Sequence, residues 1–218
     1  MPKDTFFNLP EEKRERVIQV ALEEFAQHGY AQASVSRMVR RAGIAKGSIY
    51  QYFDDKKDLY LYLIRLVGEA KVRFMAQEKP PAGRDFFEDF RGQLLAGARF
   101  GLASPRNQLY VQVASKMYAS PIRDEMLAKM KEMSEAYLAD LVRAAQEKGQ
   151  IRTDVPVELV TYFLNAVMSE FHRYVARVAG VDPDRIAEPE ILERMQGLDL
   201  EGIFTDLVGL LRDGLRKA

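Results

Sequence analysis

Apolar residues recur three or four positions apart along almost the whole chain, and turn-forming residues fall between these stretches. That spacing is typical of amphipathic helices and not of strands, whose apolar positions alternate. We therefore expect an all-α protein of about nine to ten helices. The expected architecture is an N-terminal three-helix domain with a helix-turn-helix, followed by a C-terminal helical bundle.

The first predicted helix begins after Asn8. The Asn8 side chain would cap the helix, and Glu11, three positions on, would reach back to complete a capping box. Gly29 is expected to end this helix in a left-handed conformation. The apolar stripe of the helix consists of Val17, Ile18, Ala21, Leu22 and Phe25.

A second helix is predicted from Ser34 to Gly43, followed by a turn of Gly43, Ile44 and Ala45 and a short third helix to about Tyr52. Two short helices joined by a tight turn with a glycine form a helix-turn-helix, which places its second helix in the DNA major groove. The residues expected to face inward are Val35, Met38, Val39, Ala42, Ile49 and Phe53.

A fourth helix is expected from Asp55, capped by its own carboxylate, to about Met75. The segment Lys79-Pro80-Pro81-Ala82-Gly83 breaks the helical pattern, because proline cannot continue a helix.

Ser104-Pro105 and Ser120-Pro121 are each interpreted as an N-cap followed by proline at the first helical position. Further helices are predicted over 84–103, 105–119, 121–148, 156–179 and 199–216, with a short one near 189–196. The expected domains are 1–55 and 56–218.

Charge changes this picture locally. The chain has 32 Lys+Arg and 32 Asp+Glu, so the whole-chain balance indicates no polyanionic partner. Residues 37–57, however, include six basic and two acidic side chains, which gives this segment a net charge of +4 (six minus two). Such a local excess favours phosphate binding, because counterion release supplies much of the affinity for DNA. The basic residues are Arg37, Arg40, Arg41, Lys46, Lys56 and Lys57, and the acidic ones are Asp54 and Asp55.

The absence of cysteine excludes disulfides, thiolate metal sites and cysteine nucleophiles, and suits a reducing compartment. Residues 1–10 carry no apolar signal region, and no run approaches the roughly 18 apolar residues that a membrane span needs. We therefore expect a cytoplasmic protein. His28 and His172 lie far apart and in no metal-ligand pattern, so neither a metal nor a cofactor is predicted.

The segment from Ser34 to Leu59, SVSRMVRRAGIAKGSIYQYFDDKKDL, resembles the DNA-binding segment of the tetracycline-repressor (TetR) family. Three features fall in register: alanine-glycine-aliphatic at 42–44, glycine-hydroxyl-aliphatic-tyrosine at 47–50, and a phenylalanine followed by lysine and leucine. The resemblance covers about residues 10–60, and the turn at 149–156 is similar to the one before the family's eighth helix. The sequence departs from the family at Ala45, where a serine or threonine often caps the recognition helix, so one phosphate contact is in question.

The resemblance and the local chemistry together indicate a DNA-binding set. Gly47 would let the backbone approach the DNA strand, and Ser48 offers a hydroxyl to a phosphate. Lys46 and Gln51 are candidates to contact base edges. The tyrosines are implied to contact phosphates with some stacking on sugars, and Lys56 is expected to bind a phosphate although a cation there opposes the helix dipole. The set is Ser34, Ser36, Arg37, Lys46, Gly47, Ser48, Tyr50, Gln51, Tyr52 and Lys56. Arg40 and Arg41 fit either a solvated surface or a DNA contact.

Methionines and aromatic residues crowd the second predicted domain. Most of them must form its core, yet flexible and flat side chains can also enclose a cavity for a hydrophobic effector, acyl-like or aromatic. Polar residues on apolar helices could orient such a ligand, or could simply lie at the surface. The candidate pocket residues are Phe90, Arg99, Tyr110, Phe163, Asn165, Phe171 and His172.

The resemblance also implies a homodimer in which helices 156–179 and 199–216 form a four-helix interface, although each could equally be buried in its own monomer. The function hypothesis is a ligand-responsive transcriptional regulator, a repressor released from a palindromic DNA operator by a small effector. An enzyme is disfavoured, because the sequence offers no histidine-anchored triad, phosphate-binding glycine loop or paired-carboxylate motif. A helical ligand carrier or interaction module with an incidental basic patch is the other alternative.

Overall fold

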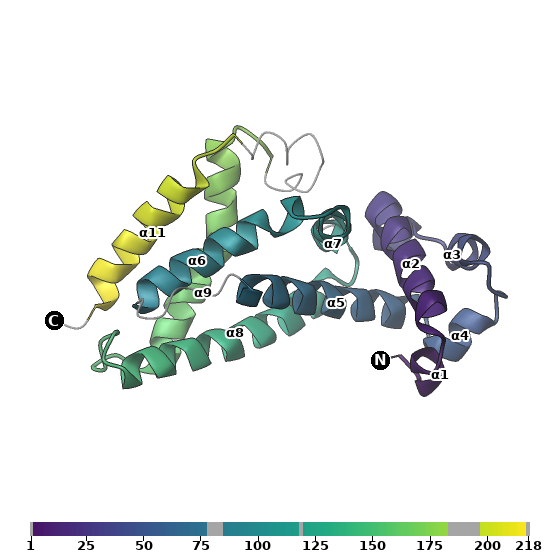
Figure 1. The fold of residues 1–218 in the computed structure, drawn as a ribbon, viewed down its shortest axis with the longest axis horizontal. Helices are drawn as coiled ribbons and strands as arrows, with labels where there is room; N and C mark the ends of the chain where they lie inside the picture. Colours follow the sequence, from purple (N-terminus) through teal and green to yellow (C-terminus); the bar gives the residue numbers. More distant parts are fainter. Residues whose placement is uncertain (1, 78–84, 118–119, 183–196, 217–218) are drawn as a thin grey trace. The chain divides into compact units, whose positions relative to one another are not determined.

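The computed structural model describes residues 2–77, 85–117, 120–182 and 197–216, apart from the side chains of 129–134, 169 and 172. The regular structure of these residues is helical throughout, as the apolar spacing predicts (Figure 1). The chain forms two compact units: Met1–Val72 with Gly101–Met126, and Arg73–Phe100 with Leu127–Ala218. No described helix is long and apolar enough to cross a membrane.

The first unit begins with a helix that the pattern did not predict. Asn8 ends this helix by donating its backbone N–H to the Asp4 carbonyl at 2.9 Å, and α2 begins at Glu11 after Pro10 without a side-chain cap. The predicted capping box of Asn8 and Glu11 is therefore wrong, because Pro10 and not Asn8 precedes the first helical residue. The helices of this unit are α1 (Asp4–Phe7), α2 (Glu11–Gln32), α3 (Val35–Ala42), α4 (Ser48–Tyr52), the first part of α5 (Lys56–Gln77), and α7 (Pro105–Lys116).

The predicted stripe of α2 is buried. Gly29 has φ 65° and ψ 174°, so it bends α2, and helical structure resumes as far as Gln32. Ser34 caps α3 as predicted, its hydroxyl accepting the Arg37 backbone N–H at 3.3 Å, and Gly43 ends α3 in the left-handed conformation. These local signals therefore place α3 correctly.

The turn between α3 and α4 spans residues 43–47 and is longer than predicted. The Ser48 N–H donates to the Ala45 carbonyl at 2.9 Å, so residues 46–47 form a turn and α4 begins only at Ser48. Ile49 and Phe53 are buried, as predicted. The Asp55 carboxylate accepts the Asp58 N–H at 2.7 Å and caps α5, again as predicted.

Helix α7 packs against α2 within the first unit. Arg106 donates to the Gln19 side-chain oxygen at 3.1 Å and to the Glu15 carboxylate at 3.0 Å. The buried Tyr60 hydroxyl of α5 donates to the Val113 carbonyl of α7 at 3.1 Å. The first unit therefore contains part of α5 and all of α7 in addition to residues 1–55.

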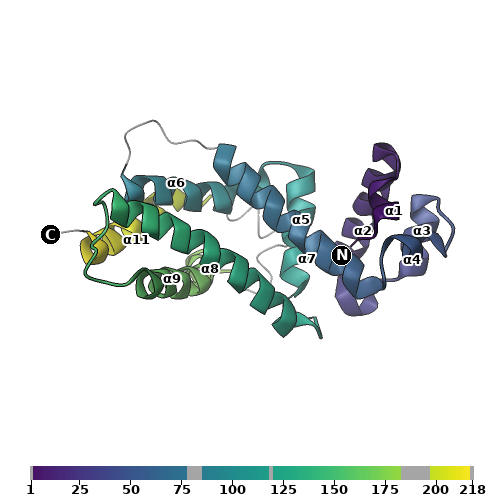
Figure 2. The same ribbon diagram turned by 90° about the horizontal axis from the view of Figure 1, so that it is seen from below.

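The second unit has a core formed by four helices, which Figure 2 shows gathered together: α6 (Phe86–Arg99), α8 (Arg123–Glu147), α9 (Val157–Val178) and α11 (Leu200–Leu215). A capping box of Asp85 and Glu88 begins α6, and a short 3-10 helix, Phe100–Leu102, follows it. Core residues from all four helices include Phe87, Val142, Leu164 and Leu211.

The two serine-proline predictions have different outcomes. The Ser104 hydroxyl accepts the Asn107 N–H at 3.1 Å and α7 starts at Pro105, as predicted. Ser120 does not start α8, because its hydroxyl accepts the Ile122 N–H in a turn and the helix begins at Arg123. The predicted break at 79–83 and the short helix at 189–196 lie outside the described residues.

Candidate nucleic-acid interface

Helices α3 and α4 each bury one side against the rest of the first unit and expose the other side, here called the outer face. Met38, Val39, Ala42 and Ile49 are buried against apolar side chains of α2 and α5. The polar residues on the outer face point to solvent, and 48 % of the Tyr50 side chain is exposed. The exposed positions of this face are Ser36, Arg40, Lys46, Gly47, Tyr50 and Gln51, with Ser48 half-buried at the start of α4.

Gly47 is not explained by the fold. Its φ of −68° and ψ of −22° are ordinary helical angles that any residue adopts. A Cβ built on it would meet nothing within 4 Å. Neither the φ angle nor the packing at this position requires a glycine, and the backbone there is open to close approach from outside.

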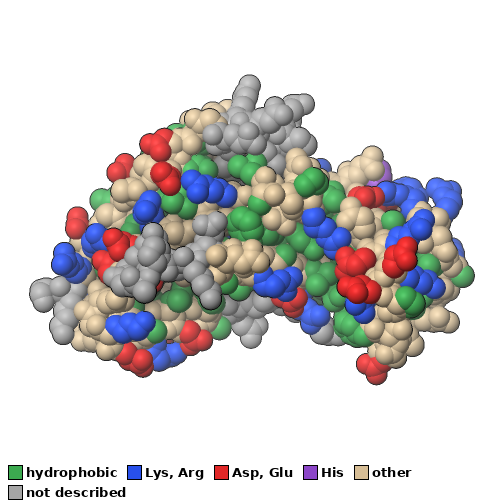
Figure 3. All heavy atoms as spheres, in the orientation of Figure 1, with side chains coloured by type: hydrophobic (Ala, Val, Ile, Leu, Met, Phe, Trp, Pro, Cys, Tyr) green, Lys and Arg blue, Asp and Glu red, His purple; other side chains and the backbone are tan. Residues whose placement is uncertain are grey.

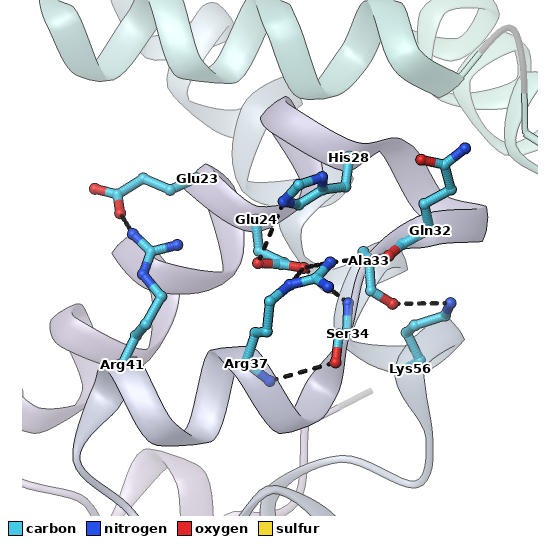
Figure 4. Close-up of polar contacts among 9 residues, drawn as sticks. All are labelled: Glu23, Glu24, His28, Gln32, Ala33, Ser34, Arg37, Arg41 and Lys56. Carbon is cyan, nitrogen blue, oxygen red and sulfur yellow. Dashed lines mark hydrogen bonds and ion pairs between the residues drawn. The ribbon is translucent and has the colours of Figure 1, made fainter.

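A buried carboxylate joins α3 to α2 (Figure 4). Glu24 is 1 % exposed, and its Oε1 accepts the Ser34 backbone N–H at 2.8 Å, the Arg37 Nε at 2.8 Å and the Arg37 Nη2 at 2.5 Å. His28 Nε2 lies 4.0 Å from its other oxygen. Burial by itself raises the pKa of Glu24, but the hydrogen bonds from Arg37 and Ser34 outweigh burial and hold the pKa below its ordinary value.

This pairing changes the expected role of Arg37. Its guanidinium is bound to Glu24 and also donates to the Gln32 carbonyl at 3.0 Å. We therefore interpret Arg37 as a residue that fixes the start of α3 against α2, and leave it out of the interface proposed below. Ser34 likewise serves as the cap of α3.

Lys56 also has an intramolecular role. Its Nζ donates to the Tyr30 carbonyl at 2.8 Å and to the Ala31 and Ala33 carbonyls at 3.3 Å, and lies 4.7 Å from the centroid of the Tyr30 ring. These carbonyls end α2, where a cation is favourable. Because the ammonium group is engaged by the end of α2, we interpret Lys56 as a structural residue and leave it out of the interface proposed below.

The local charge excess is partly balanced within the first unit. Three of the six basic residues pair with carboxylates, namely Arg37, Arg41 and Lys57, whereas Lys56 binds uncharged carbonyls. Arg41 pairs with Glu23, and Lys57 pairs with Glu125 at 2.5 Å. In the space-filling view, blue and red side chains accordingly lie interspersed over α2, α3 and α4 (Figure 3). Arg40 and Lys46 are exposed on the outer face.

Tyr52 belongs to the core. Only 6 % of its side chain is exposed, and its ring centroid lies 5.9 Å from that of Phe6 in α1. The expected stacking of Tyr52 on DNA sugars is wrong, because Phe6 and the neighbouring core cover the ring.

The sequence interpretation missed two contributors to this surface. One is Glu24, which lies three residues after Ala21 on the inward side of α2. An acidic residue on an otherwise apolar helix face could have indicated a buried carboxylate. The other contributor is α1 with its N-cap residue Lys3, because the Lys3 and Thr5 side chains donate to carbonyls of α4. A four-residue helix has no periodicity from which it could be predicted.

The expected effector-pocket residues are divided between the two units. Tyr110 lies in the first unit, where it is buried and its hydroxyl accepts from Arg106 Nε at 3.2 Å. In the second unit, Phe163 is 44 % exposed on α9 and Asn165 is half-buried. The side chain of His172 lies outside the described residues.

The remaining pocket candidates contact neighbours within the second unit. Phe90 is part of the main core. Arg99 pairs with Glu201 at 3.5 Å, and the Phe171 ring lies 5.3 Å from the Phe204 ring. In this single chain Phe163 is exposed, and Tyr110 belongs to the first unit, so the pocket stays a prediction.

Comparison with known proteins agrees with this arrangement. The profile of bacterial regulatory proteins of the tetR family matches residues 17–63. The chain is 30% identical over 190 residues to the HTH-type transcriptional repressor AcnR of Corynebacterium glutamicum, covering 86% of this chain and 93% of that protein. It is 24% identical over 177 residues to the probable acrEF/envCD operon repressor of Escherichia coli K12, covering 78% and 79%.

Among solved structures, a TetR family transcriptional regulator from Chloroflexus aurantiacus is 37% identical, with a TM-score of 0.65 and 100% of both chains covered. The likeness to this structure and to the repressor from C. glutamicum extends over both units and not only over the helix-turn-helix. The relatives are transcriptional regulators and not enzymes. The chain therefore belongs to the TetR family of bacterial transcriptional regulators.

Proposed function

We propose that this regulator is a cytoplasmic repressor that binds operator DNA through the outer face of α3 and α4. The exposed polar face of α3 and α4 carries the proposal, and Gly47 supports it, because the open space around its backbone would allow a DNA strand to approach closely. Lys46 and Gln51 would contact base edges, while Ser48 and Tyr50 would donate to phosphates. The complete proposed interface is Ser36, Arg40, Lys46, Gly47, Ser48, Tyr50 and Gln51.

The substitution Gly47→Ala tests this proposal. An alanine Cβ has free space in the protein alone, and the helical backbone accepts it, so the variant keeps or gains stability. In the complex the same methyl group would separate the backbone from the DNA strand, so affinity for the operator falls. The operator is first selected from random duplexes with the wild-type protein, and the Kd is then measured by fluorescence anisotropy. Unchanged affinity would refute the assignment.

Lys46→Ala provides a second test. Loss of a base contact is expected to cost about 1–3 kcal/mol, roughly 5- to 150-fold in Kd, and to relax base preference at one position. Lys148→Ala is the matched control, because Lys148 is an exposed lysine near the end of α8. Equal binding by the two variants would count against Lys46.

We propose further that α9 and α11 form a homodimer interface. Six large apolar side chains on these helices are at least 44 % exposed: Leu159, Tyr162, Phe163, Tyr174, Val178 and Leu210. Exposed apolar surface of this kind marks an interaction site. Other apolar residues of the two helices, including Val160, Leu164 and Phe204, are buried in their own subunit and are left out of the interface.

The double substitution Tyr162→Glu and Leu210→Glu tests the dimer. The two residues are 65 % and 76 % exposed, so a monomer tolerates the introduced carboxylates, whereas a dimer would have to bury them. We expect the mass from light scattering to halve. Val72→Glu, at a position 52 % exposed on α5, is the control and should keep the dimer. A dimer would present two copies of α4 to a palindromic operator with half-sites about 34 Å apart or a multiple of that spacing.

We propose a small hydrophobic effector for the second unit. Support comes from its aromatic-rich core, in which Phe86, Phe87 and Phe90 line one face of α6. A coupling of about 1–3 kcal/mol between effector and operator would change affinity 5- to 150-fold. A panel of acyl and aromatic compounds added to the protein–operator complex tests this, and unaltered affinity across the panel would contradict it.

A further inference from the structure

Helix α4 depends on other parts of the chain for its C-terminal hydrogen bonds. It has only five residues, and so short a helix is not stable alone. The last carbonyls of any helix have no partner within the helix. Gly47 at the N-terminal end provides no side-chain cap either.

Residues of α1 and its N-cap supply those hydrogen bonds. The Lys3 Nζ donates to the Tyr50 carbonyl at 3.0 Å, the Thr5 hydroxyl donates to the Gln51 carbonyl, and the Lys3 backbone N–H donates to the Tyr52 carbonyl at 2.9 Å. Three consecutive carbonyls at the end of α4 are thus bound by two residues about 50 positions earlier in the sequence. The Lys3 ammonium also places positive charge at the helix C-terminus, where it is favourable.

Phe6 anchors this segment. Its side chain is fully buried, and its ring lies 4.9 Å from the Phe53 ring and 5.6 Å from the Tyr62 ring of α5. Lys3 also pairs with Asp54, just after α4, at 2.9 Å. The contacts of α1 therefore hold both the end of α4 and the residues that connect α4 to α5.

We propose that residues 3–6, here called the N-terminal clamp, position α4 for operator binding without contacting DNA. The inference rests on the proposed function of α4 as the DNA-contacting helix. It assigns Lys3, Thr5 and Phe6 as positioning residues, because each acts on the operator only through α4. Operator affinity consequently depends on side chains outside the helix-turn-helix.

The test uses Thr5→Val, which removes the hydroxyl at nearly constant volume, and Lys3→Met, which removes the ammonium and keeps most of the alkyl chain. Amide hydrogen exchange of residues 48–53 is measured without DNA, and the Kd for the selected operator duplex is measured over a range of salt. Each lost hydrogen bond is expected to speed α4 exchange about fivefold and to weaken binding by up to the same factor. Thr5→Ser keeps the hydroxyl and should restore both.

Thr205→Val is the matched control, because the Thr205 hydroxyl donates to the Glu201 carbonyl in α11 at 2.7 Å. It should leave α4 exchange and operator affinity unchanged. Unchanged α4 exchange in Thr5→Val and Lys3→Met would overturn the clamp. A fall of about one in the salt slope for Lys3→Met would show a phosphate contact and overturn the positioning role of Lys3.

The outcome also separates the clamp from the proposed function. If the clamp variants speed α4 exchange but keep operator affinity while Lys46→Ala weakens binding, the positioning inference fails and the interface stands. If Lys46→Ala and Gly47→Ala leave binding unchanged, the interface itself fails. The exchange measurement contains no DNA, so it reports on the clamp in either case.

Discussion

Glu24→Gln is the sharpest test of how the helix-turn-helix is held together. The carboxylate is 1 % exposed and accepts hydrogen bonds from the Ser34 backbone and from two nitrogens of Arg37. A hydrogen bond to a charged group contributes about 1.5–3 kcal/mol. Glutamine keeps one acceptor oxygen but removes the charge and places an NH₂ donor in the same pocket. We expect a loss of about 2–3 kcal/mol in the free energy of unfolding.

Urea denaturation at pH 7 measures this loss. Glu23→Gln is the matched control, because the neighbouring Glu23–Arg41 pair is partly exposed, with side chains 34% and 41% accessible (Figure 4). Exposed pairs contribute about 0–1 kcal/mol. Equal shifts of the two denaturation midpoints would refute the argument that burial makes Glu24 the stronger contributor.

The pH dependence gives an independent check. The pKa of Glu24 is lowered in the folded protein, so its contribution is fully present above the ordinary value of 4.5 and is lost as the pH falls through the folded pKa. The stability difference between the wild type and Glu24→Gln should therefore be constant near neutrality and shrink below about pH 4. A difference that stays constant in acid would contradict the lowered pKa.

Further predictions concern other hydrogen bonds in the first unit. Lys56→Met should lower the thermal midpoint but leave the salt slope of operator binding unchanged, whereas a phosphate contact would reduce that slope by about one. Tyr60→Phe removes the hydrogen bond to the Val113 carbonyl and should cost about 1 kcal/mol in urea denaturation, with no change in operator Kd. Ser104→Ala removes the cap that accepts the Asn107 N–H and should cost about 1 kcal/mol by the same assay; an unchanged midpoint would contradict the capping role.

The helices and several of their ends follow from the sequence because their determinants are local. Apolar spacing reports which face of a helix is buried, and this is why the inward positions of α2, α3 and α4 were predicted correctly, apart from Val35, which is only half-buried. Ser34, Gly43 and Asp55 act within three residues of their own positions, as cap or left-handed terminus. The resemblance of residues 34–59 to the DNA-binding segment of the TetR family is likewise visible in the sequence, because it is carried by residues that follow one another along the chain.

Tertiary structure decided what the polar side chains contact. Helical phase shows that Arg37 is near the surface, but only the packing of α3 on α2 brings it to Glu24, 13 residues away. The same reasoning applies to Lys56 and the end of α2, and to Tyr52 beneath Phe6. A periodic pattern records whether a position is buried and carries no information about which distant segment covers it. The sequence alone therefore indicated which segment forms the candidate DNA-binding surface, and the fold determined which of its charged groups remain exposed on the proposed interface.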